Sequence, residues 1–253
     1  MIPVVLDGDQ GRGRLLTSAF IALTLSDLAY FTAIGVMIPV VPLFASDRLG
    51  VGAVGVGVAI GLFSMIALVL RPFAGRLSDQ WGSGWLFLSG AVLFTVAAAA
   101  HLLVTEYWSL LLLRVVLGVA DAMFVVAGVA AMGDMAPPDR LGEALSYNSL
   151  GLYIGIAAGP ALGEWLLRVG GFRAAWIGVL CLGAMAALFA TRVPSMRQSV
   201  DGGAKPSPLP RRLIGPGLVF LAGLASAAGF LAFAAIHARD VGLGGAGGVL
   251  FVY

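Results

Sequence analysis

The sequence predicts an all-α polytopic membrane protein. Of its 253 residues, 60% are hydrophobic and only 11% are charged, and the mean hydropathy is +0.99. Soluble domains carry about 25% charged residues, so this chain has too little polar surface for a soluble globule of its length. Its apolar residues also fall into long runs separated by short polar gaps. These observations exclude a cytosolic enzyme, a nucleic-acid-binding domain and a disordered tail.

Several apolar runs reach the roughly 20 residues that a membrane-spanning helix needs. The predicted spans are 15–45, 51–74, 84–104, 108–132, 144–167, 172–191 and 213–237, with an eighth span beginning at 245. Segment 1–14 is polar after its first residues and lacks a clear cleavage site, so we expect the first run to be the first span.

The basic residues in the gaps predict the orientation. With the N-terminus in the cytoplasm, the inner gaps contain Arg12, Arg14, Arg71, Arg76, Arg140, Arg192, Arg197, Lys205, Arg211 and Arg212. The outer gaps contain the smaller set Arg48, Arg168, Arg173 and Arg239. Positive charge concentrates on the cytoplasmic side of membrane proteins, so we expect a multi-pass protein of the cell membrane with a cytoplasmic N-terminus.

One gap differs from the others and predicts a domain boundary. Segment 192–212 is polar and rich in proline, glycine and serine. A weak repeat supports a boundary here, because Gly-Ala-Val-Gly-Val at 52–56 recurs as Gly-Ala-Gly-Gly-Val at 245–249. The predicted organisation is a cytoplasmic N-terminus (1–14), a six-helix bundle (15–191), a cytoplasmic linker (192–212) and the incomplete start of a second bundle (213–253).

The gap after the second span carries the pattern G-x-L-x-D-x-x-G. Gly75 and Gly82 permit helix termination and close approach, and Asp79 can cap a helix N-terminus or meet the end of a helix dipole. This segment resembles the signature loop between the second and third spans of the major facilitator superfamily, although Gln80, Ser83 and Gly84 stand where that family usually has basic residues. The resemblance implies that the loop helps to latch two halves of a transporter in its outward-open state.

Three further segments resemble the twelve-span drug–proton antiporters of that family. They are Pro39-Val40-Val41-Pro42 in the first span, Arg114 to Gly118 in the fourth, and Gly155 to Gly163 in the fifth. The resemblance covers about 15–253 and implies a six-span N-terminal half followed by span seven and the start of span eight.

The resemblance also implies a function: secondary active, proton-coupled efflux of small amphipathic compounds by alternating access. The expected partners are a small-molecule substrate, protons and the lipid bilayer; we expect no cofactor, and a monomer when complete. The sequence lacks an ATP-binding phosphate loop, and its lone cysteine and two histidines favour neither a disulfide framework nor a metal site. Two alternatives remain: a sugar or metabolite carrier of the same fold, and a non-transporting membrane scaffold or sensor.

Charged residues inside spans are costly and are functional candidates by default. Three occur here: Asp27 in the first span and Arg114 and Asp121 in the fourth. Arg114 and Asp121 are seven residues apart and share one helix face, and at ~1.5 Å per residue Asp121 lies nearer than Arg114 to the depth of Asp27. We expect Asp27 and Asp121 to bind the coupling proton and Arg114 to tune it; the alternative is a static buried ion pair.

The fifth span carries a glycine every four residues. Gly155, Gly159 and Gly163 form a smooth stripe for close helix packing, and Pro160 interrupts the backbone hydrogen bonds. A second expectation is that the stripe provides a hinge-like or leak-proof contact between the two halves.

Polar side chains at the start of the fifth span are candidate substrate contacts. They are Tyr147, Asn148 and Tyr153, and the alternative is hydrogen bonding between helices. His101 and His237 are expected at span ends, where water or headgroups would satisfy them.

Overall fold

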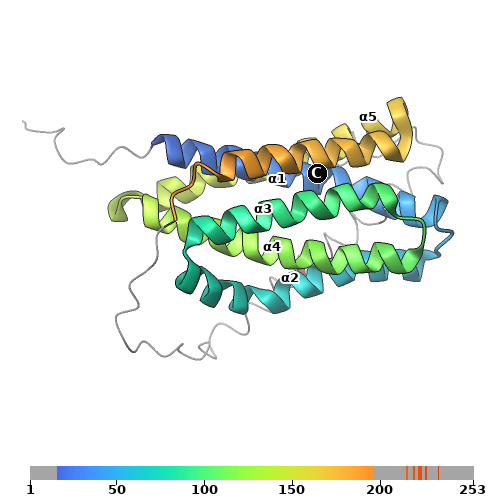
Figure 1. Ribbon diagram of the computed structural model, residues 1–253, viewed down its shortest axis with the longest axis horizontal. Helices are drawn as coiled ribbons and strands as arrows, with labels where there is room; N and C mark the ends of the chain where they lie inside the picture. Colours follow the sequence, from blue (N-terminus) through green and yellow to red (C-terminus); the bar gives the residue numbers. More distant parts are fainter. Residues whose placement is uncertain are drawn as a thin grey trace, which may run out of the picture.

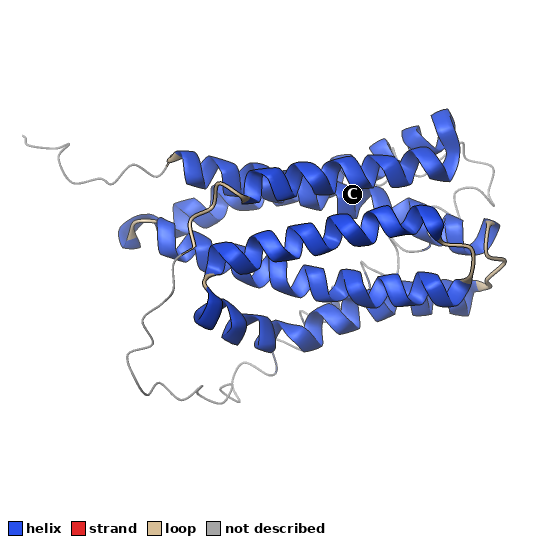
Figure 2. Ribbon diagram, viewed as in Figure 1, coloured by secondary structure: helices blue, strands red, loops and turns tan. Residues whose placement is uncertain are grey.

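The computed structural model describes residues 16–195 and six single residues after them, at 215, 219, 222, 223, 226 and 233. Residues 16–195 form helices and contain no strand (Figure 2). The α-helices are α1 (Ser18–Asp47), α2 (Ala53–Trp81), α3 (Ser83–Ala100), α4 (Tyr107–Met135) and α5 (Leu141–Ala190). Two 3₁₀ turns, η1 (His101–Leu103) and η2 (Pro138–Arg140), flank α4. The predicted all-α fold is confirmed.

Among the described residues, five helices are long and apolar enough to cross a membrane, and α5 contains two crossings. Its helical geometry breaks at Gly170 and at Gly171, whose φ of 63° and ψ of −160° suit glycine. Leu166 and Gly178 lie on opposite sides of this break and are close in space, since a methyl group added to Gly178 would be 2.5 Å from Cδ1 of Leu166. In a straight helix, residues twelve positions apart would be separated by about 18 Å. The chain therefore folds back at this break, which falls in the predicted gap between spans 144–167 and 172–191.

The helices run side by side along the long axis of the molecule (Figure 1). Helix α1 packs mainly on α5, α2 on α4, and α3 lies between α4 and α5. Aromatic rings fill the centre: Tyr30 stacks on Phe124 at 3.9 Å between ring centroids, and Phe124 stacks on Phe87 at 4.2 Å. These three rings, from α1, α4 and α3, tie the two sides of the bundle together.

The glycine stripe of α5 lies directly against α1. A methyl group on Gly159 would come within 2.5 Å of Cα of Gly35, and one on Gly155 within 2.8 Å of the backbone nitrogen of Thr32. Gly163 and Pro160 are also buried. Because α1 covers this face, these glycines join two helices of the same bundle, and the expected contact between two halves stays a prediction.

The turn between α2 and α3 is much shorter than the predicted gap over 71–82. Helix α2 continues through Gly75 and Asp79 to Trp81, and Gly82 alone reverses the chain with φ 97° and ψ 141°. Gly82 is also the N-cap of α3, so the suggestion that Asp79 caps a helix N-terminus is wrong. The polar residues of 71–81 extend a helix beyond its apolar part.

The N-terminus of α3 joins three parts of the chain. The Ser83 hydroxyl donates to Oδ2 of Asp134 at the end of α4, at 2.8 Å. The Trp85 backbone N–H donates to the Ser195 hydroxyl at 3.3 Å, and a methyl group on Gly84 would meet the Pro194 carbonyl oxygen at 2.6 Å. The residues that follow α5 are therefore docked on the first turn of α3.

Several expectations lie outside the described residues. They concern segment 1–14, positions 196–212 of the linker, the repeat at 245–249, His237 and, apart from the six single residues, the predicted spans after 212.

Candidate functional site

The buried carboxylate of Asp27 lies where α1, α4 and α5 meet. Its Oδ2 accepts a 2.6 Å hydrogen bond from the side-chain amide of Asn148 on α5. Gly128 of α4 lies opposite: a methyl group added there would be 3.9 Å from Oδ1 of Asp27 and would crowd the Phe87 ring at 3.0 Å. The neighbouring Ser26 hydroxyl donates to the Ala186 carbonyl at 2.8 Å, which ties α1 to the second crossing of α5.

Tyr30 connects α1 to the second carboxylate. It follows Asp27 by nearly one helical turn, and its hydroxyl donates to Oδ1 of Asp121 on α4 at 3.5 Å. Asp121 is 7% exposed. The ring of Tyr30 is held against Phe124, so the hydroxyl has a fixed direction.

Arg114 is buried against α2, away from a carboxylate partner. Its Nε donates to the Ala59 carbonyl at 3.1 Å, and its guanidinium carbon lies 4.8 Å from the ring centroid of Phe63. Within residues 16–195 it makes no ion pair with Asp27 or Asp121, so the expected alternative of a static buried ion pair is not what the structure contains.

The structure separates the three predicted substrate contacts. Asn148 is buried against Asp27, whereas Tyr147 and Tyr153 are 47% and 68% exposed on another face of α5. Gly75 and Asp79, which were predicted to lie in a loop, lie toward the end of α2. A methyl group added to Gly75 would be 4.0 Å from the Val126 side chain of α4. They belong to the α2–α3 end of the bundle.

Neither the role of Tyr30 nor the partner of Asn148 was predicted from the sequence. The position of Tyr30, three residues after an intramembrane carboxylate, places it on the same helix face and could have identified it. The pairing of Asn148 with Asp27 joins residues 121 apart and has no local signal. His101 was placed in water or headgroups, which is wrong: it is 1% exposed, and its Nδ1 lies 2.7 Å from the Ala97 carbonyl.

This arrangement suits reversible protonation better than covalent chemistry. Asp27 and Asp121 can each hold or release a proton, and Asn148 and Tyr30 supply hydrogen-bond donors that stabilise the charged forms. The described residues contain no group of three or more metal-ligating side chains.

Comparison with known families decides the classification. Residues 20–253 match the family model described as Major Facilitator Superfamily. The chain belongs to the Major Facilitator Superfamily. Membership of this superfamily of transporters agrees with the prediction of a multi-pass membrane transporter that is not an enzyme.

Curated members of the superfamily are similar over much of the chain. It is 28% identical over 237 residues to the "Uncharacterized MFS-type transporter YhhS" of Escherichia coli strain K12, which covers 89% of this chain and 56% of the relative. It is 27% identical over 139 residues to the "Quinolone resistance protein NorA" of Staphylococcus aureus strain Mu50, covering 55% of this chain and 36% of the relative. The chain spans about half the length of the curated relatives it matches.

Solved structures of the superfamily share the fold. A bacterial homolog of the human lysosomal transporter Spinster, solved inward-facing and unoccupied, matches with a TM-score of 0.72 at 16% identity, covering 96% of this chain and 59% of that one. A structure of proton-dependent oligopeptide transporters matches with a TM-score of 0.65 at 16% identity, over 85% and 48% of the two chains.

Proposed function

We propose that this chain forms the first half and the start of the second half of a proton-coupled exporter of small amphipathic compounds, working by alternating access. Family membership supports a transporter, and the similarity to a quinolone resistance protein supports export of drug-like compounds. In the cell membrane, the N-terminus would be cytoplasmic, as the distribution of basic residues favours.

The observation that carries this proposal is the hydrogen bond between Asn148 and Asp27. It buries a titratable group in an apolar bundle, with a donor on one helix and the carboxylate on another. Ionisable groups at such depth mark proton or ion pathways in membrane proteins. A structural role alone would be served by an uncharged pair at less desolvation cost.

The geometry gives each residue a part in the proposed coupling. Protonation of Asp27 removes the negative charge that Asn148 donates to, and so weakens the link between α1 and α5. Tyr30, on the same helix as Asp27, donates to Asp121, which would provide a second position for the proton on α4. Arg114 stabilises the contact of α4 with α2 and adds positive charge on the same helix as Asp121. Substrate movement would depend on which of these links is intact.

The α2–α3 turn has a separate role in this proposal. The segment from Gly75 to Gly82 would contribute to holding the transporter closed on one side, as the family resemblance implies. Ser83 and Gly84 provide contacts to Asp134 and Pro194 here. Such a latch would depend on the uncharged hydroxyl of Ser83 and on packing at Gly84, rather than on the basic residues that the family usually has at these positions.

The test measures proton movement in inside-out vesicles that contain the product of the complete open reading frame. Amphipathic cationic drugs are added after the lumen is acidified, and release of protons is followed. We expect release by the wild type and its loss in Asp27→Asn. Asp139→Asn, which removes an exposed carboxylate before α5, is the matched control and should retain release.

Two outcomes would contradict the proposal. Release that survives in Asp27→Asn would show that Asp27 does not carry the proton and would direct attention to Asp121. An absence of release with any compound, from protein shown to be inserted and folded, would contradict drug–proton antiport itself.

A further inference from the structure

A cavity of about 590 Å³ opens at the end of the bundle where α1 ends. Its walls come from the end of α1, from η1 and the residues after it, and from the start of the second crossing of α5. Phe44, which lines it, lies about 25 Å along α1 from Asp27 at 1.5 Å per residue. The cavity is therefore distinct from the proposed proton site, and its volume falls in the range of small-molecule sites.

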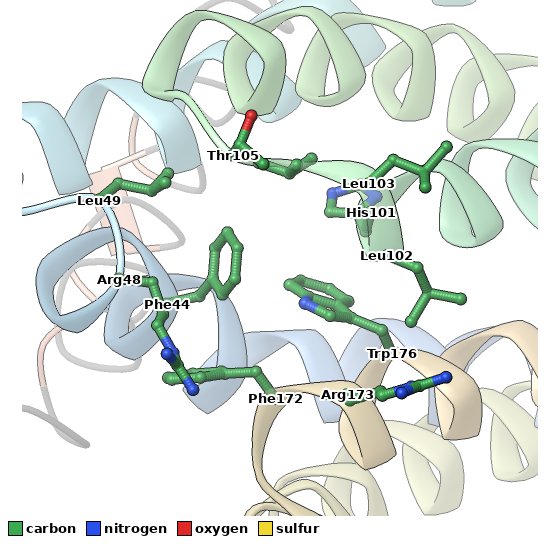
Figure 3. A pocket seen from close by; sticks show the side chains of 11 residues that line it. Phe44, Arg48, Leu49, His101, Leu102, Leu103, Thr105, Phe172, Arg173 and Trp176 are labelled. Atoms are coloured by element: carbon green, nitrogen blue, oxygen red, sulfur yellow. The ribbon is translucent and has the colours of Figure 1, made fainter.

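Aromatic rings form one wall of this cavity. Phe44 meets Phe172 edge to face at 5.2 Å between centroids and Trp176 at 5.5 Å. Figure 3 shows Phe44 beside Trp176, with Phe172 below them and His101 on the other side of the indole. These rings, together with leucine side chains from η1, offer an apolar surface to part of a ligand.

Two buried polar atoms in the lining residues have no hydrogen-bond partner. They are Nε2 of His101 and Nε1 of Trp176, whose rings lie 4.5 Å apart. Because Nδ1 of His101 lies 2.7 Å from the Ala97 carbonyl, which only accepts, Nδ1 carries the proton and Nε2 is an acceptor. The Trp176 N–H is a donor, so two neighbouring rings carry an unused acceptor and an unused donor.

The mouth of the cavity is positively charged. Arg48 and Arg173 both line it, and the Arg48 guanidinium lies 5.7 Å from the ring centroid of Phe172. In the part of the chain that the structure describes, neither arginine has a carboxylate within 4 Å. Guanidinium groups recognise phosphate and carboxylate through paired, charge-assisted hydrogen bonds.

We propose that this cavity binds an amphipathic anion whose phosphate or carboxylate carries a neighbouring hydroxyl group. The anionic group interacts with Arg48 and Arg173, the hydroxyl donates to Nε2 of His101, and an oxygen of the ligand accepts from Nε1 of Trp176. The apolar portion packs against Phe44. A hydroxylated phospholipid headgroup and a free organic phosphate share this chemistry.

The test measures ligand-induced shifts of the thermal unfolding midpoint of the product of the complete open reading frame, purified in a neutral detergent. The probes are phosphatidylglycerol, glycerol 3-phosphate and, as a headgroup without a hydroxyl or net charge, phosphatidylcholine. A shift with phosphatidylglycerol alone identifies a lipid site, and a shift with glycerol 3-phosphate identifies a site for a free anion. The absence of a shift with both overturns the proposal.

Variants separate this site from general attraction of anions to a basic surface. We expect the double variant Arg48→Gln, Arg173→Gln to weaken binding by about tenfold or more. Arg168→Gln is the matched control: Arg168 precedes the Gly170–Gly171 turn of α5, is exposed, and does not line the cavity. Equal weakening in the control and the double variant would contradict a built site.

Trp176→Phe tests the unpartnered donor. It keeps an aromatic ring but removes the N–H and part of a buried side chain, so the midpoint of the variant without ligand is the reference for its ligand-induced shift. The ligand-induced shift should fall to less than half, because binding then lacks its donor. An unchanged shift in this variant would show that the indole nitrogen takes no part in binding.

Discussion

Asn148 and Asp27 lie 121 residues apart in the sequence and share a 2.6 Å hydrogen bond in the buried centre of the bundle. The bond joins the first crossing of α5 to α1, directly beside the glycine stripe that brings the two backbones together. A change in the protonation of Asp27 therefore acts beside a close backbone contact between α1 and α5.

Asn148→Ala should destabilise the protein by about 1–3 kcal/mol, because it leaves the buried Asp27 carboxylate without its amide donor. The measurement is the thermal unfolding midpoint in detergent. Ser149→Ala, at the next position of α5, is the control and should change the midpoint little. Equal midpoints for wild type and Asn148→Ala would show that the bond contributes little to stability.

Tyr30→Phe should separate coupling from stability. The hydroxyl lies 3.5 Å from Asp121, at the long limit of a hydrogen bond, while the ring keeps its stacking on Phe124. We expect a stability loss below about 1 kcal/mol and a clear decrease in drug-induced proton release. A normal rate of proton release in this variant would remove Tyr30 from the proposed proton path.

Arg114→Lys should destabilise the contact of α4 with α2. A lysine keeps the charge but cannot reproduce both the Nε bond to the Ala59 carbonyl and the planar packing over Phe63. We expect a loss of about 1–3 kcal/mol in the free energy of unfolding. Arg192→Lys, an exposed position after α5, serves as the control and should behave as wild type.

Gly159→Ala should destabilise the α1–α5 contact by about 1–3 kcal/mol, because the added methyl group meets the backbone of Gly35 at 2.5 Å. Gly61→Ala on α2 is a control of opposite sign: nothing lies within 4 Å of its added methyl group, and alanine favours a helix by about 1 kcal/mol over glycine. A midpoint for Gly159→Ala at or above that of wild type would contradict the close packing.

The crossings could be predicted from sequence because hydropathy and length decide which segments lie in a bilayer. The break at Gly170 and Gly171 falls in a predicted gap for the same reason. The extension of α2 to Trp81 could not be predicted in this way, since hydropathy does not distinguish a polar loop from a helix that projects beyond the membrane. Hydrogen bonding continues through those polar residues until Gly82 ends it.

Of the residues in the candidate site, only the charged ones could be predicted from the sequence. Asp27, Arg114 and Asp121 stand out because a charge in an apolar run is rare, and the structure buries all three. Their partners could not be predicted, because a tyrosine, an asparagine or a backbone carbonyl in a span carries no comparable signal. The burial of His101 could not be predicted, because Trp176 of α5 packs against it only once the helices come together.

The contacts of Ser195 and Pro194 with the first turn of α3 give the chain a fixed point of departure from the bundle. Any pull on the residues that follow is transmitted first to α3, and through Ser83 and Asp134 to the end of α4. The same end of α5 is also tied to α1, because the Ser26 hydroxyl next to Asp27 donates to the Ala186 carbonyl. A displacement at this end of the molecule therefore reaches α3 and α4 directly, and reaches the helix of the buried carboxylate through α5.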